Sequence, residues 1–224
     1  MLTKLKNYKI ERNRRIKSIK IFDKKSLTEW QKILNNKKLK KFKPLFQKYF
    51  DFLNNLKYLH HNNQTYFSHP LRVTCMTFNL TKFTKSTKNL IILSLFHNII
   101  ETSNYKKKFL NKYLGIKITK QIEVLTVNRK KQWNINYKKK YYNNISSNHK
   151  NTRIVKIIDK LDNLFTIGLC KSKLTRKRYI SEIENYILPM IKIDIPELEV
   201  YLKGLIKQSK KLGYYKNYEF GDKK

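Results

Sequence analysis

The chain is short of acidic residues and of the residues that interrupt helices. Its 224 residues include 15 Asp and Glu against 51 Lys and Arg, and only five Gly and four Pro. So little Gly and Pro, with few alternating apolar and polar runs, predicts long helices joined by short loops. Apolar residues make up 40% of the chain, and this length suits one main domain. We therefore expect an all-α globular protein.

Cysteines and long hydrophobic runs are also scarce. Cys75 and Cys170 lie in no ligand-spaced cluster, so neither a zinc module nor a disulfide framework is indicated. The longest apolar stretch, 90–100, is far shorter than the ~20 residues of a membrane span. The first twenty residues are basic without an apolar core, which excludes a secretory signal but leaves a transit peptide or a basic arm open. We expect a cytoplasmic protein, with an organellar matrix as the alternative, and no membrane contact.

The formal net charge of +36 has two interpretations. Such an excess of cations is typical of proteins with a polyanionic partner such as RNA. Only eight of the 51 cations are Arg, however, and Asn, Ile and Tyr are abundant, as AT-rich codons would produce. Both interpretations stay open, and both predict attraction to phosphate that weakens as salt rises.

Periodicity and capping signals divide the chain into three parts. We expect a basic arm or helix over 1–25, a main domain over 26–192, and a C-terminal helix with a basic tail over 193–224. In the first half of the main domain we expect a helix opened by a capping box at 26–29, a helix with Pro44 in its first turn, a helix that begins near Pro70, and a helix over 87–100 capped by Ser86. Two short helices within 107–127, broken at Gly115, and a surface excursion over 128–147 should follow. The last expected helices span 153–165, 176–191 and 196–212, and the last of them is opened by Pro196 after Asp194.

Polar residues interrupt apolar segments at three places. These are Ser68-His69-Pro70, Phe96-His97-Asn98, and the stretch 156–163 around Asp159. A His or Asp on a buried helical face costs free energy unless it is paired or binds a metal ion, and His with carboxylate is a normal ligand set for a divalent first-row ion. Singly, each has a simpler explanation: His69 as a cap, His97 as a hydrogen-bonded core residue, Asp159 as a solvated carboxylate.

The order and spacing of these segments favour a shared site. Tyr66-Phe67-Ser68-His69-Pro70-Leu71-Arg72-Val73 resembles the aromatic-x-x-His-Pro-Leu-x-Val segment of the HD superfamily, in particular of the hydrolase domain of RelA/SpoT proteins. Leu93 to Thr102 is similar to Leu-Leu-His-Asp-x-x-Glu-Asp-Thr, and Val155 to Leu164 to Ile-Lys-Leu-Ala-Asp-Arg-Leu-His-Asn-Leu. The resemblance spans about residues 45 to 190 and implies an HD-domain helical bundle.

The resemblance also implies roles for particular residues. His69, His97 and Asp159 would be metal ligands, with Asn98 in place of an Asp ligand, and Mn²⁺ would be the ion. Glu101 would assist water activation, whereas Thr102 replaces the second acid of that pair. Asn163, with Thr166 beside it, would contact a nucleotide. Since Asn98 lacks the charge of Asp, we expect weaker metal binding.

The segment before His69 departs from the pattern. Relatives usually place Arg or Lys there to hold the nucleotide, whereas 60–65 has neither, and this weakens the case for guanine recognition. We interpret His60 and His61 as surface residues at a helix end, with a substrate role as the alternative.

Two functions compete at this point, and an HD phosphohydrolase with another substrate is a further alternative. The first is a phosphohydrolase that uses metal-activated water to remove the 3'-pyrophosphate of guanosine polyphosphate, (p)ppGpp. The second is a catalytically degenerate HD-fold scaffold that binds RNA or a ribonucleoprotein through residues 4–20 and 129–142. The losses at Asn98 and Thr102 favour the second, and the retained His69, His97, Asp159 and Glu101 favour the first.

Overall fold

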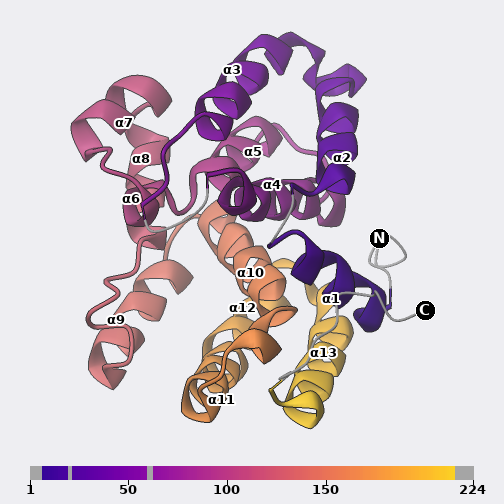
Figure 1. The fold of residues 1–224 in the computed structure, drawn as a ribbon. Helices are drawn as coiled ribbons and strands as arrows, with labels where there is room; N and C mark the ends of the chain where they lie inside the picture. The colour runs from indigo at the N-terminus through magenta and orange to yellow at the C-terminus, as the bar shows by residue number, and fades with distance from the viewer. Residues whose placement is uncertain (1–6, 20–21, 60–62, 215–224) are drawn as a thin grey trace.

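The computed structural model describes residues 7–19, 22–59 and 63–214, and in these ranges every regular element is a helix (Figure 1). The predicted all-α class is confirmed. The elements are α1 Tyr8–Lys17, α2 Lys24–Leu34, η2 Lys37–Phe42, α3 Lys43–Asn54, α4 Asn63–Leu80, α5 Thr87–Phe96, α6 Ile99–Thr102, α7 Lys107–Leu114, α8 Ile116–Leu125, α9 Ile135–Ser146, α10 Lys150–Leu164, η3 Ile167–Leu169, α11 Lys173–Glu182, η4 Ile183–Ile187, α12 Leu188–Asp194, η5 Pro196–Leu198 and α13 Glu199–Leu212.

Helices α4 and α10 form the centre of the bundle. Helix α4 packs against α2, α3, α5 and α10, while α10 also contacts α5, α8, α12 and α13. In Figure 1, α2 and α3 lie above α4, α7 and α8 lie on one side, and α11 to α13 lie below. The consecutive helices α4 and α5 therefore meet α10, which lies far from them in the sequence, in the middle of the molecule.

Helix α10 shows why the sequence folds this way. Its apolar side chains recur at helical spacing and are buried, and His149 caps its first turn by accepting a hydrogen bond from the Asn151 N–H at 3.1 Å. Its buried apolar residues are Ile154, Val155, Ile157, Ile158, Leu161 and Leu164. The predicted helix over 153–165 is observed, with one more turn at its start.

The prediction that a helix begins near Pro70 is wrong. Helix α4 runs from Asn63 to Leu80 with Pro70 inside it. Proline removes one backbone donor and usually breaks a helix interior. Here Phe67, Leu71 and Val73 on the same helix are fully buried, so tertiary packing offsets the lost hydrogen bond.

The helix expected over 87–100 is interrupted at the residues of most interest. Helix α5 ends at Phe96, and a separate turn, α6, begins at Ile99. Between them Asn98 has φ −120° and ψ 13°, outside helical geometry. Ser86 stands at the N-cap of α5 but its side chain makes no capping bond. His97 keeps helical dihedral angles as the C-cap of α5, so the break falls at Asn98.

The stretch 128–147 is more than a surface excursion. Residues 135–146 form helix α9, whose Tyr141, Tyr142 and Ile145 are buried. Tyr141 and Ile145 are four positions apart, as on one helical face, and tyrosine rings supply apolar area that a reading based on aliphatic residues misses. The two short helices expected within 107–127 are observed as α7 and α8, separated at Gly115, where φ is +87°.

Helix starts differ from the predictions at two ends of the domain. Helix α2 begins at Lys24, because the Asp23 side chain accepts hydrogen bonds from the backbone N–H groups of Lys25 and Ser26. The capping box expected at 26–29 is therefore inside the helix. Asp194 does not cap the last helix, since it forms an ion pair with Arg153 at 2.6 Å. The helix expected over 176–191 is a longer run, α11, η4 and α12, with a π-helical turn at 183–187 just before Pro189.

The sequence left a loose basic arm or a helix open for the N-terminus, and residues 8–17 form a helix. Helix α1 packs on α13, where the Tyr8 hydroxyl donates to the carbonyl of Tyr201 at 3.1 Å and Arg12 donates to Gln208 at 2.8 Å. Arg12 and Arg15 are buried, so they are not free to contact RNA. The division of the chain at residues 25 and 192 stays a prediction.

Gly204 tests the contact between these two helices. A Cβ added at Gly204 would collide with the Tyr8 hydroxyl. We expect Gly204→Ala to lower the free energy of unfolding by about 1–3 kcal/mol in urea titrations, because Tyr8 must leave its site. In a Tyr8→Ala background the same change should be neutral or stabilising, since Ala is the better helix former. Equal effects in both backgrounds would contradict this account.

Candidate metal centre

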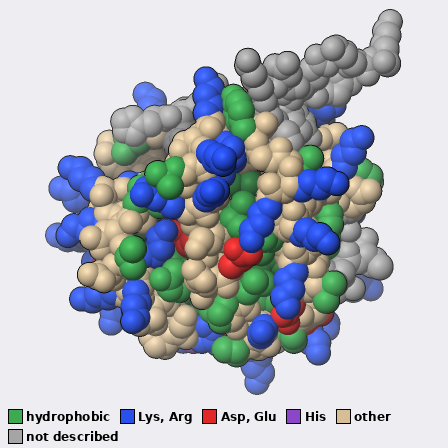
Figure 2. Space-filling model, turned by 90° about the horizontal axis from the view of Figure 1, so that it is seen from below, with side chains coloured by type: hydrophobic (Ala, Val, Ile, Leu, Met, Phe, Trp, Pro, Cys, Tyr) green, Lys and Arg blue, Asp and Glu red, His purple; other side chains and the backbone are tan. Residues whose placement is uncertain are grey.

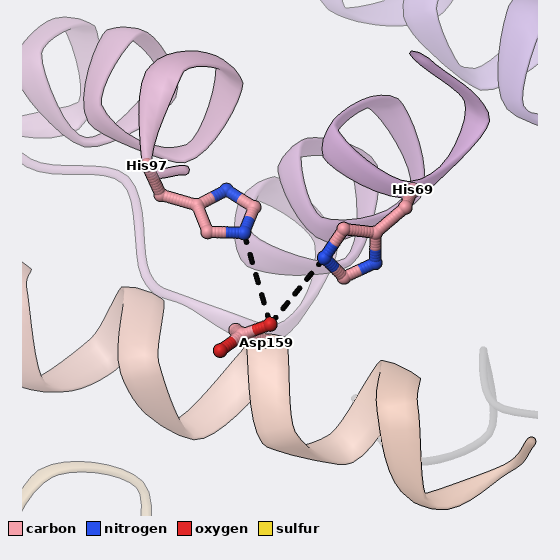
Figure 3. Close-up of side chains that lie close together, drawn as sticks. All are labelled: His69, His97 and Asp159. Carbon is pink, nitrogen blue, oxygen red and sulfur yellow. Dashed lines mark ion pairs between the residues drawn. The ribbon is translucent and has the colours of Figure 1, made fainter. Parts of the chain in front are cut away.

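Three side chains from three helices converge at the centre of the bundle (Figure 3). His69 lies on α4, His97 is the C-cap residue directly after α5, and Asp159 lies on α10. Asp159 Oδ1 is 3.3 Å from His69 Nε2 and 3.7 Å from His97 Nε2. The three ligand atoms lie within 4.8 Å of one another, and the two rings meet edge to face with centroids 5.2 Å apart.

Each imidazole is oriented by a bond to its other nitrogen. His97 Nδ1 is 2.7 Å from the carbonyl oxygen of Ser94, so this nitrogen carries the proton. His97 Nε2 is buried, has no hydrogen-bond partner and lies on the side of the ring that faces Asp159. His69 Nδ1 is 2.8 Å from Asp162 Oδ2. Two Nε2 atoms facing one carboxylate, one of them unpartnered, fit a divalent first-row metal ion.

Asp159 is held as an anion by its surroundings. Burial raises its pKa, but Lys156 and the two histidines outweigh burial and hold the pKa well below the usual range. The Lys156 ammonium lies 3.1 Å from Oδ2, and Asn163 Nδ2 donates to Oδ1 at 2.7 Å. Asp159 therefore offers a charged oxygen on the side of the histidines.

Asn98 lies at the edge of this cluster and is largely buried. Its Nδ2 donates to the Tyr66 hydroxyl at 2.5 Å, which leaves the amide Oδ1 as its acceptor atom. An amide oxygen can serve as a neutral metal ligand, without the charge of a carboxylate. The Thr102 hydroxyl donates to the Asn98 carbonyl at 2.9 Å and so supports the turn of α6.

Glu101 has two partners that the sequence did not predict. Its Oε2 is 2.6 Å from the Arg129 guanidinium, and its Oε1 accepts a hydrogen bond from the backbone N–H of Val127 at 2.9 Å. Both partners belong to the loop between α8 and α9. Glu101 thus ties this loop to the pocket wall, and both of its carboxylate oxygens have partners in the loop.

A pocket of about 780 Å³ opens beside the cluster, within the range of small-molecule sites. His69, His97 and Asp159 line it together with Asn98, Glu101, Asn163 and Thr166, so the expected metal-binding, catalytic and nucleotide-contacting residues share one cavity. The Thr166 hydroxyl donates to the Asn163 carbonyl at 3.1 Å. The cationic and aromatic residues of the wall are Arg72, Arg129, Lys138, Lys156, Lys160, Tyr66, Trp133, Tyr137, Tyr141, Tyr142 and Tyr179. Such a wall suits a phosphorylated, aromatic ligand.

Glu182 holds two of these lysines in the wall. Its carboxylate is 2.5 Å from Lys160 Nζ and 2.7 Å from Lys138 Nζ, and it accepts from the Tyr142 hydroxyl at 2.6 Å. Burial opposes ionisation, but Lys160, Lys138 and Tyr142 lower the pKa of Glu182 to about 2. The carboxylate therefore remains charged through the whole physiological range of pH.

This network predicts an acid-sensitive part of the stability. Because the folded pKa lies below the ordinary value of 4.5, the network stabilises the fold above about pH 4.5, and that stabilisation is lost as the pH falls toward 2. The full shift corresponds to about 3 kcal/mol. We expect Glu182→Gln to remove this component of the pH dependence in urea unfolding between pH 6 and pH 3. Glu184→Gln, which breaks the exposed pair with Lys210, is the control, and equal pH profiles for both variants would contradict the assignment.

Several site residues escaped the sequence analysis. Asp162 and Lys156 lie one helical turn after and before Asp159, a spacing that could have marked them. Tyr66, the aromatic residue of the His69 motif, and Arg129, in the segment 129–142, were not assigned to the site, since their contacts with Asn98 and Glu101 join distant segments. His60 and His61 lie outside the described residues, as do residues 4–6 and 20 of the basic arm.

The basic surface gives no support to an RNA partner. On the face shown in Figure 2, Lys and Arg side chains are spread around the molecule and do not form one stripe. Arg129 and Lys138, from the loop and helix assigned to RNA contact, pair with Glu101 and Glu182 in the pocket. None of the described helices combines the length and apolar character needed to cross a bilayer.

Comparison with known proteins supports the fold. No protein-family model and no curated sequence matches this chain. The solved structure of a metazoan ortholog of SpoT, a protein that hydrolyzes ppGpp, is similar, with a TM-score of 0.58 and 18% sequence identity. The similarity covers 74% of this chain and 93% of that one. The chain therefore has the all-helical HD-domain fold of SpoT-type hydrolases.

Proposed function

We propose that this protein is a divalent-metal-dependent phosphohydrolase that removes the 3'-pyrophosphate of guanosine polyphosphate, (p)ppGpp. The observation that carries the proposal is the convergence of His69, His97 and Asp159 on one point, with the unpartnered Nε2 of His97 facing it. The cationic pocket beside this point and the SpoT-type fold agree with the substrate class.

His69, His97 and Asp159 would hold the metal ion, with Asn98 Oδ1 as a neutral fourth donor. Mn²⁺, or another divalent first-row ion, supplies Lewis-acid chemistry that polarises the phosphoryl group and acidifies water. Lys156 neutralises the second oxygen of Asp159 and keeps that carboxylate ionised for its ligand role. The site has one carboxylate ligand, so its affinity for the ion should be modest.

The remaining pocket residues bind and orient the substrate. Arg129, Lys138 and Lys160 bring positive charge to the wall, although each is paired with a carboxylate in this state. Phosphate oxygens of the substrate can attract Arg129 away from Glu101, because its side chain is two-thirds exposed. Asn163 and Thr166 are the proposed nucleotide contacts; Asn163 uses its Nδ2 on Asp159 and keeps its amide oxygen for the base.

The proposed reaction adds water across the bond between the 3' oxygen and the pyrophosphate. The water oxygen bonds to phosphorus, the 3' oxygen leaves, and the products are inorganic pyrophosphate and a guanosine nucleotide with a free 3'-hydroxyl. Glu101 would take the proton of the attacking water on Oε2 once Arg129 has moved to the phosphates. Thr102 cannot share this task, because a hydroxyl is not a base near neutral pH.

The test is hydrolysis of ppGpp by the purified protein with Mn²⁺, with a chelator as the control. We expect release of pyrophosphate that stops when the chelator is added. If the protein binds Mn²⁺ but leaves ppGpp and pppGpp intact, the substrate assignment is wrong. If the protein does not bind Mn²⁺, the proposed metal centre itself is wrong.

A further inference from the structure

A buried carboxylate joins the candidate metal centre to helix α1. Asp162 is three residues after Asp159 on α10, and its side chain is 1% exposed. Its Oδ2 lies 2.8 Å from His69 Nδ1 and accepts a bond from Arg72 at 2.8 Å. Its Oδ1 lies 2.6 Å from Arg15 Nε. One carboxylate thus bridges a metal-ligand imidazole and two arginines.

Arg15 reaches this carboxylate from outside the segment that resembles RelA/SpoT hydrolases. It lies on α1, is fully buried, and places its guanidinium 5.1 Å from the ring centre of Phe165. Its second carboxylate is Glu11, at 3.2 Å on the same helix. A buried guanidinium is tolerated only when it is paired. The position of α1 therefore depends on the charge of Asp162, and the burial of the Asp162 carboxylate depends on the charge of Arg15.

Position 162 is also a departure from the resembled pattern. The similar segment Ile-Lys-Leu-Ala-Asp-Arg-Leu-His-Asn-Leu has His where this chain has Asp162. A carboxylate accepts a hydrogen bond from an imidazole N–H and makes the other nitrogen a better metal ligand. Arg15 and Arg72 provide the positive charge that a buried carboxylate requires at this place.

We propose that Asp162, anchored by Arg15 of α1 and by Arg72, is a positioning residue that keeps the proton of His69 on Nδ1 and its Nε2 directed at Asp159. Helix α1 then supports the metal centre through the contact of Arg15 with Asp162. The inference rests on the proposed metal-dependent function for its consequence, although the orientation of His69 can be tested without a metal ion.

The first experiment measures Mn²⁺ binding by the electron paramagnetic resonance signal of the free ion. Its variants are Asp162→Asn, Arg15→Met and the double variant, which removes the charges of Asp162 and Arg15 together, so that of the two arginines only Arg72 loses its anion. We expect Mn²⁺ affinity to fall about 10- to 100-fold in Asp162→Asn and in the double variant. Circular dichroism must show that the variants keep their helices.

Arg14→Met is the matched control. Arg14 lies on the same helix and pairs with Glu11 and Asp23, so its loss also breaks ion pairs of α1. We expect its Mn²⁺ affinity to stay within twofold of the native value. A folded Asp162→Asn or double variant that binds Mn²⁺ as tightly as the native protein would overturn the proposal.

The second experiment needs no variant at Asp162. Nitrogen-15 spectra of the histidines in the metal-free native protein, at a pH where the rings are neutral, report which nitrogen of His69 is protonated; His69→Ala assigns the signal. We expect Nδ1–H, with its proton resonance shifted downfield by the carboxylate. A His69 protonated on Nε2 would refute the positioning role. A native protein that shows Nδ1–H but binds no Mn²⁺ would instead refute the proposed metal centre and leave the positioning role standing.

Discussion

Replacing Asp159 with asparagine is expected to abolish Mn²⁺ binding and to lower kcat/KM for ppGpp by about 10³-fold or more. Asp159 is the one carboxylate of the described three-residue cluster, and both histidine Nε2 atoms face its Oδ1. Asparagine keeps the shape of the side chain but removes its charge. Without the bound ion, the reaction loses a stabilisation of the transition state worth several kcal/mol. Pyrophosphate release and Mn²⁺ titration measure the two effects.

The design must separate lost chemistry from lost folding. Lys156 would remain buried without its anion, so some loss of stability is expected and must be measured. Asp51→Asn is the matched control, because Asp51 is exposed on α3, where its carboxylate accepts a hydrogen bond from Gln47. Native rates of chelator-sensitive hydrolysis in folded Asp159→Asn would show that Asp159 holds no catalytic metal ion.

Replacing Asn98 with aspartate is expected to raise Mn²⁺ affinity by about tenfold or more, and turnover of ppGpp with it. The change adds a negative charge where the amide oxygen now stands, and a further unit charge near a divalent ion is worth at least ~1.4 kcal/mol in a partly buried site. The Tyr66 hydroxyl, which now accepts from Asn98 Nδ2, can rotate to donate to the new carboxylate. Titration with Mn²⁺ before and after the change measures the gain.

Asn185→Asp adds the same charge outside the pocket and should leave Mn²⁺ affinity unchanged, since Asn185 is exposed. An Asn98→Asp protein that binds Mn²⁺ no more tightly than this control would mean that residue 98 does not contact the ion. If Asn98→Asp alone hydrolyses ppGpp, the native protein keeps the scaffold of the enzyme with a weakened metal centre.

Much of the fold could be predicted from local patterns. The periodic apolar residues of 153–165 and the break at Gly115 correspond to α10 and to the α7–α8 junction. Helix boundaries were less predictable where packing overrides local preference. Pro70 inside α4 and the tyrosine-lined face of α9 are the clearest cases, because neither follows from propensity alone.

For the site, the sequence by itself determined the order and chemical type of the ligand residues, since His69, His97 and Asp159 are embedded in segments with recognisable spacing. Only the tertiary structure decided how they are held. The contacts that hold them join segments far apart in the chain: Asp162 contacts His69, Arg15 pairs with Asp162, and Arg129 pairs with Glu101. The strength of such contacts depends on distance and burial after packing, and no local pattern encodes either quantity.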